Sequence, residues 1–144
     1  MWKLSYSIGR IFIAVLFIVS GIQKVLNVGG VARMLTDAGL VIPLAVEPYL
    51  QGIPRYEAAG YAIALLEMTC GLMVMIGVLA RWAALVLIVF TAATIVLVHH
   101  FWSMDGAAFA MHQSQALKNL SIIGGLLLVV AGGSHGSSFN GRRP

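Results

Sequence analysis

The stretch from residue 60 to residue 79, GYAIALLEMTCGLMVMIGVL, constrains the fold most, because it is apolar almost throughout yet carries Glu67 near its middle. An ionised carboxylate at that depth in a bilayer costs roughly 2.5–3.5 kcal/mol on insertion scales, so it usually faces the inside of a helix bundle and has a partner. Gly60, Ala64 and Gly71 fall on about the same helical face and allow another helix to approach closely. The stretch therefore predicts a membrane helix whose polar face is turned toward neighbouring helices.

The composition indicates an integral membrane protein. Of the 144 residues, 60% are hydrophobic and only 10% are charged, whereas soluble domains contain about 25% charged residues. A water-soluble fold of this length, with room for one domain, cannot hide so much apolar surface. The net charge of +4 does not indicate nucleic acid binding, because the basic residues flank apolar runs, where they anchor and orient membrane helices.

The apolar runs predict an all-α, four-helix membrane bundle in one domain of residues 1–133, with spans at about 6–26, 57–79, 82–100 and 115–131. The long first connection is interrupted by Gly and Pro and is expected to be partly helical. It has a short amphipathic helix at 31–38 and a turn at 44–50, both at the membrane interface. Residues 101–114 are expected to form a short connection, and residues 134–144 a flexible tail.

Four spans place both termini on one side of the membrane. That side carries five basic residues and no acidic ones: Lys3, Arg10, Arg81, Arg142 and Arg143. The positive-inside rule therefore predicts a multi-pass protein of the bacterial inner membrane with both termini in the cytoplasm. The first and third connections would then face out.

Polar residues within the spans are the candidate functional residues. Lys24, His99, His100 and Asn119 are expected near the outer ends of their helices, Glu67 near the midplane and Arg10 inside the opposite boundary. At 1.5 Å per residue, Glu67 lies roughly 10–13 Å in depth from both Arg10 and Lys24, so the sequence leaves its ion-pair partner open.

Two interpretations of this polar set remain open. In the first, Glu67 and its basic partner fix the register of the bundle. In the second, a polar pocket binds a quinone headgroup or relays protons, which suits histidine because its charge changes near neutral pH. On that hypothesis the catalytic residues are Glu67, Lys24 and His99, and the cofactor-binding residues are Asn119, His100 and Arg10.

The histidine-bearing third connection does not predict a metal site. Imidazole, thioether and carboxylate groups occur together there, but without the tight ligand spacing of a copper or zinc site. No C-x-x-C-H motif indicates covalently attached haem. Cys70 is the single cysteine and is interpreted as a small buried hydrophobe, which excludes a dithiol oxidoreductase acting through its own cysteines.

Several runs along the chain resemble the DoxX family. They are GRIFIAVLFIVSGIQKVL from residue 9, LLEMTCGLMVMIGVLAR from residue 65, HHFW from residue 99 and ALKNLSIIGGLLLVVAGG from residue 116. The resemblance implies a four-helix membrane bundle. It also implies a loose link to quinone-connected redox or sulfur metabolism, since some relatives resemble subunits of thiosulfate:quinone oxidoreductases.

These observations favour a small membrane subunit or anchor of a larger redox or bioenergetic complex, in contact with lipids and with other membrane subunits or a second copy of the chain. Quinone is the cofactor expected to fit; haem and copper are disfavoured. The alternative is a stand-alone quinone-linked oxidoreductase of small reduced sulfur compounds, which predicts a pocket lined by Lys24, Glu67, His99 and Asn119. A third hypothesis is a metal-handling or small-solute transporter, which predicts that His99 or His100 approaches His112 or Asp105.

Overall fold

A computed structural model describes residues 2–132, and in that range the chain is all-α. Four long helices make up the bundle: α1 (Trp2–Leu26), α3 (Arg55–Ile76), α4 (Ala80–Leu97) and α5 (Gly106–Gly132). Within the described residues, these are the helices long and apolar enough to cross a membrane. The predicted integral membrane four-helix bundle is confirmed.

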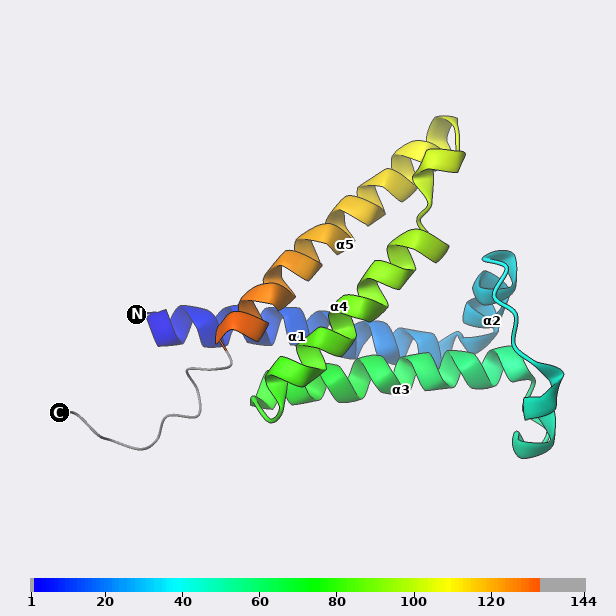
Figure 1. Cartoon of the computed structure of the whole chain (residues 1–144), viewed down its shortest axis with the longest axis horizontal. Coiled ribbons are helices and arrows are strands. Elements are labelled where there is room, and N and C mark those ends of the chain that lie inside the picture. The colour runs from blue at the N-terminus through cyan, green and yellow to red at the C-terminus, as the bar shows by residue number, and fades with distance from the viewer. Residues whose placement is uncertain (1, 133–144) are drawn as a thin grey trace.

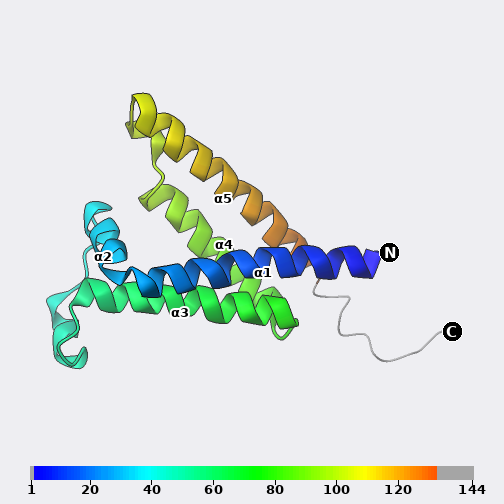
Figure 2. The same ribbon diagram turned by 180° about the vertical axis from the view of Figure 1, so that it is seen from behind.

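The four helices form two antiparallel pairs. Helices α1 and α3 lie side by side along the length of α3, the start of α1 extends beyond it, and α4 packs mainly against α5 (Figure 1). The pairs meet at the end where α1 and α4 begin and α3 and α5 end, which we call the terminal end. They diverge toward the opposite end, which we call the pocket end, as both views show (Figures 1 and 2).

Small residues set the close approach of α1 and α3. Gly60, Ala64, Glu67 and Gly71 are buried on one face of α3, as their spacing predicts. A Cβ atom on Gly21 would lie 2.8 Å from the Ala64 carbonyl oxygen, and one on Gly71 would lie 3.2 Å from a carbonyl oxygen of α1. Larger side chains at these positions would push the two backbones apart.

The hydrophobic core lies where the two pairs meet. Val74, Leu87 and Leu126, from α3, α4 and α5, are fully buried there, and Ala14 and Phe17 of α1 pack into the same cluster. Because this cluster fixes the pairs at the terminal end, their divergence leaves space between them at the pocket end.

The turn between α3 and α4 comes earlier than the sequence predicts. The expected span reached residue 79, but α3 ends at Ile76, because Gly77 adopts the left-handed conformation (φ 87°) that commonly ends helices. Helix α4 accordingly begins at Ala80, and the antiparallel hairpin predicted from the short connection is present.

The long first connection is partly helical, as predicted. It holds α2 (Val28–Asp37) and the 3-10 helix η1 (Leu44–Tyr49). Helix α2 begins earlier than residue 31 because the Asn27 side chain accepts a hydrogen bond from the backbone N–H of Gly30 and caps its first turn. Val31 and Leu35 are its buried residues, and the helix packs against the start of α3.

Helix α5 begins at Gly106 instead of near residue 115, so much of the expected third connection is helical. The sequence AAFAMHQ that follows Gly106 has a high helical propensity but is too polar at its end for a hydropathy pattern to include it. Asn119 therefore lies well inside the helix instead of in its first turn. The predicted tail, residues 134–144, lies outside the described residues.

Candidate functional site

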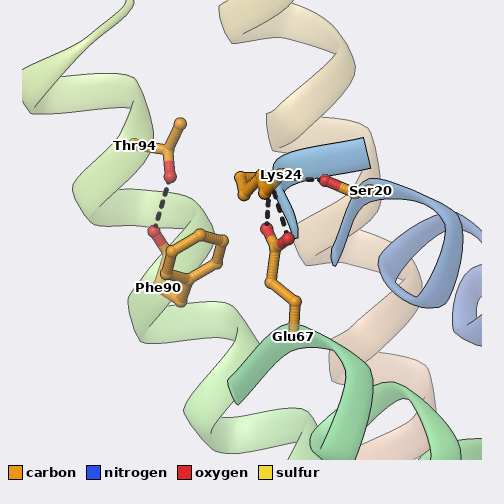
Figure 3. Close-up of polar contacts among 5 residues, drawn as sticks. All are labelled: Ser20, Lys24, Glu67, Phe90 and Thr94. Carbon is orange, nitrogen blue, oxygen red and sulfur yellow. Dashed lines mark hydrogen bonds and ion pairs between the residues drawn. The ribbon is translucent and has the colours of Figure 1, made fainter. Parts of the chain in front are cut away.

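A buried ion pair joins α1 to α3 (Figure 3). The Lys24 ammonium group donates hydrogen bonds to both carboxylate oxygens of Glu67, over 3.0 Å to Oε1 and 2.8 Å to Oε2. Glu67 is only 2% exposed, whereas the Lys24 side chain is 20% exposed. The structure thus resolves the choice that the sequence left open, and Lys24 is the partner.

Ser20 is a third member of this network, and sequence reasoning missed it. Its Oγ atom accepts a hydrogen bond of 2.6 Å from Lys24 Nζ (Figure 3). The two residues are four positions apart on α1 and therefore share a helical face, which is the signal that would have identified Ser20.

Arg10 is not part of the network. Its guanidinium group lies at the terminal end of the bundle, against Gly77, and Arg10 does not line the cavity described below. The cofactor-binding role predicted for Arg10 therefore has no support from its position.

A cavity of about 430 Å³ lies between the two helix pairs at the pocket end. Lys24, Glu67, His99 and Asn119 all line it, and most of the remaining wall is apolar. Its volume is within the range of roughly 300–1,000 Å³ that small-molecule and cofactor sites occupy. An apolar cavity with a few convergent polar groups is the usual form of such sites.

The first connection supplies one wall of the cavity, which the sequence did not reveal. Met34, Leu35 and Ala38, in and just after α2, line it together with Leu40. Because α2 packs against α3 by its buried face, this connection forms part of the cavity wall instead of lying apart from the bundle.

Two threonines of α4 also line the cavity but are bonded within their own helix. Thr91 Oγ1 donates to the Leu87 carbonyl over 2.7 Å, and Thr94 Oγ1 donates to the Phe90 carbonyl over 3.0 Å. These bonds satisfy the hydroxyl donors, so the threonines contribute mainly shape to the cavity wall.

His99 lies at the cavity wall and pairs with His112 of α5. Their Nδ1 atoms are 3.3 Å apart, and His112 Nδ1 is also 3.1 Å from the Val98 carbonyl oxygen. In the tautomer with a proton on His112 Nδ1, that N–H donates to the carbonyl and faces His99 Nδ1 as acceptor. His99 is then neutral, and its single N–H proton is on Nε2.

His100 is not among the residues that line the cavity. Its ring lies beside Trp102, with centroids 6.3 Å apart. Between residues 2 and 132, no three or more His, Cys, Asp or Glu side chains gather where they could hold a metal ion. His99 does approach His112, as the transporter hypothesis predicted, but among the described residues no third ligand joins the two histidines.

Four membrane-spanning helices, a partly helical first connection and an interhelical cavity with a buried ion pair define a small multi-pass membrane protein. The profile of the DoxX family matches residues 5–100, which include Lys24, Glu67 and His99. The chain belongs to the DoxX family. A second profile, that of the SURF4 family, matches residues 60–143 and overlaps the first.

One curated relative extends the similarity over nearly the whole chain. It is the inner membrane protein YphA of Escherichia coli K12, which is 26% identical over 135 residues, covering 94% of this chain and 87% of the relative. No solved structure matches the chain.

Proposed function

We propose that this protein is a quinone-binding subunit or membrane anchor of a larger redox complex in the bacterial inner membrane. The observation that carries the proposal is the cavity at the pocket end, with the Lys24–Glu67 ion pair in its wall. The relative's name as an inner membrane protein supports the location, and the resemblance to the DoxX family implies the link to quinone-connected redox systems.

The hydrogen-bond inventory of the cavity suits a quinone headgroup. Lys24 uses its three N–H groups on the two oxygens of Glu67 and on Ser20, so it has none to spare for a ligand. The Ser20 hydroxyl accepts from Lys24 and keeps its own proton for donation. With the Asn119 amide and His99, it offers neutral donors to the two carbonyl oxygens of a quinone, while the apolar wall accepts the ring and tail.

Two of the polar residues at the cavity wall can also supply the protons that quinone reduction consumes. A quinone becomes a quinol by taking up two electrons and two protons. Glu67 holds a carboxylate at the cavity wall, and His99 lies at that wall close to the end of α4, where it can exchange protons with Glu67 through water. The connections between the four long helices leave little soluble mass for further redox centres, which supports a partner protein that carries the electrons.

A second candidate is a stand-alone oxidoreductase that passes electrons from a small reduced sulfur compound to quinone. The observation that favours it is that one chain alone brings Lys24, Glu67, His99 and Asn119 to a single cavity. In this case the sulfur compound supplies the two electrons, and no partner is needed.

Purification from the native membrane in mild detergent separates the two candidates. Mass spectrometry identifies co-purifying subunits, and solvent extraction measures bound quinone. We expect about one quinone per chain together with stoichiometric redox subunits; a lone chain or homodimer with bound quinone would favour the stand-alone enzyme. An absence of quinone above the level of the bulk membrane would contradict both candidates.

A matched pair of variants on α4 tests whether the bound quinone occupies the cavity. Ala93 lines the cavity, whereas Val89, one turn earlier, is 70% exposed on the lipid-facing surface. Ala93→Trp fills the cavity and should abolish quinone retention, and Val89→Trp should retain it. Equal retention by both variants would place the quinone outside the cavity.

We also propose that both termini face the cytoplasm, because the terminal end carries Arg10 and Arg81 and no acidic residue. Alkaline phosphatase fused to residue 144 should be inactive, and the same enzyme inserted after Gln51 should be active. The reverse pattern would invert the topology.

A further inference from the structure

Arg10 is a half-buried cation without a counter-ion. Its Nε atom is buried and has no hydrogen-bond partner among residues 2–132, and no ion pair joins its guanidinium to a carboxylate there. In the described part of the chain, the Tyr6 ring stabilises its charge, with the ring centroid 5.7 Å from Arg10 Cζ. A partly buried charge of this kind is stabilised by an anionic partner.

The sequence contains no acidic side chain that could serve. Its five acidic residues are Asp37, Glu47, Glu57, Glu67 and Asp105. Four lie in or next to the connections at the pocket end, and Glu67 is paired with Lys24 in the bundle interior. The anion that completes the Arg10 site therefore comes from outside these side chains.

The position of Arg10 places its charged group at the membrane boundary. Its Cα atom lies about 9 Å inside the start of the apolar span Leu4–Leu26, from six residues at 1.5 Å each. The guanidinium, however, packs against Gly77: a Cβ atom there would lie 2.7 Å from Arg10 Nη1. Gly77 directly follows the apolar span of α3, so the guanidinium lies where that span ends, within reach of the membrane interface for a long basic side chain.

A second cation without an acidic neighbour in its own turn, Arg81, follows Gly77 in the chain. Arg81 is exposed in the first turn of α4, four residues after Gly77. That turn has no capping side chain and no acidic residue, so a positive side chain stands at the positive end of the helix dipole. An anion between Arg10 and Arg81 would offset both charges and the dipole.

We propose that the terminal end of the bundle binds the phosphate group of an anionic phospholipid through Arg10 and Arg81. A guanidinium binds a phosphate by two parallel hydrogen bonds, and basic sites between membrane helices are suited to anionic headgroups. The site is separate from the quinone cavity, which lies at the other end of α1, and it does not depend on the proposed function.

Thermal unfolding of the purified full chain in detergent, titrated with lipid, tests this proposal. Phosphatidylglycerol should raise the unfolding temperature, while phosphatidylcholine and inorganic phosphate at the same concentration should not. In Arg10→Gln, the phosphatidylglycerol concentration for half of the effect should rise about tenfold or more, from the loss of charge-assisted hydrogen bonds. The control Arg33→Gln, an exposed cation on α2 at the pocket end, should titrate as the wild type does.

Three results would overturn the proposal: unchanged titration of Arg10→Gln, equal stabilisation by phosphatidylcholine, or equal stabilisation by inorganic phosphate, which would indicate a free-anion site. If Arg10→Gln does not fold, Arg81→Gln and Arg10→Lys replace it. Both should weaken the response to phosphatidylglycerol, because the first removes one cation and the second removes the paired hydrogen bonds. A wild-type response from these two variants would refute the site equally.

Discussion

The Lys24–Glu67 ion pair should be strongly coupled, and a double-mutant cycle measures that coupling. At the observed separations of 2.8 and 3.0 Å, the attraction between the two charges is about 6 kcal/mol at an effective dielectric constant of 20, before desolvation is subtracted. Lys24→Met keeps an unbranched side chain one heavy atom shorter but leaves a carboxylate that is only 2% exposed without its cation. We expect this variant to lose about 3–5 kcal/mol of unfolding free energy.

The partner variant should cost less. Glu67→Gln leaves an ammonium group that is 20% exposed and still donates to Ser20, so we expect a loss of about 1–3 kcal/mol. The double variant should be more stable than the sum of the two losses predicts, by about 2–3 kcal/mol.

Equilibrium unfolding in mixed detergent or bicelles gives these free energies. The control is Lys118→Met on α5, an exposed lysine whose loss should change the unfolding free energy by less than about 0.5 kcal/mol. If the stability losses of Lys24→Met and Glu67→Gln simply add in the double variant, the reasoning is refuted. Additive losses are expected of two residues that do not interact, not of an ion pair.

Two further predictions concern the packing around this pair. Gly21→Ala should cost about 1–3 kcal/mol of stability, because the new Cβ atom would lie 2.8 Å from the Ala64 carbonyl oxygen; Gly124→Ala, with nothing within 4 Å, should be neutral or stabilising by up to about 1 kcal/mol. Equal changes in unfolding free energy for Gly21→Ala and Gly124→Ala would contradict close packing of α1 on α3. Ser20→Ala should cost about 1–2 kcal/mol through loss of the bond to Lys24, and a gain in stability would show that this bond is not formed.

The sequence predicted the bundle and the buried face of α3 because both follow from hydropathy and helical spacing. It could not choose between Lys24 and Arg10, because the choice depends on the register of α1 against α3. In the structure Gly21 faces Ala64, and a Cβ on Gly71 would meet the Ala14 carbonyl. Continued along the helices, this antiparallel pairing places Glu67 beside residue 18, six residues from Lys24 and eight from Arg10. The register thus favours Lys24, and it is a property of packing that no local pattern contains.

The cavity was predicted only in part. Lys24, Glu67, His99 and Asn119 were recognised because polar residues in apolar spans are conspicuous. The contribution of α2 was not, because Met34 and Leu35 look like the apolar face of any interfacial helix. The cavity itself arises from the divergence of two helix pairs, which depends on where the buried core is packed.

Photolabelling tests the central claim most directly, that the cavity at the pocket end binds a quinone. The purified chain in lipid nanodiscs is irradiated with an azido-quinone, digested and mapped by mass spectrometry. The account predicts labels on cavity residues such as Ser20 and Thr94, and their loss in Ala93→Trp but not in Val89→Trp. Labels confined to the lipid-facing surfaces, or unchanged in Ala93→Trp, would contradict it.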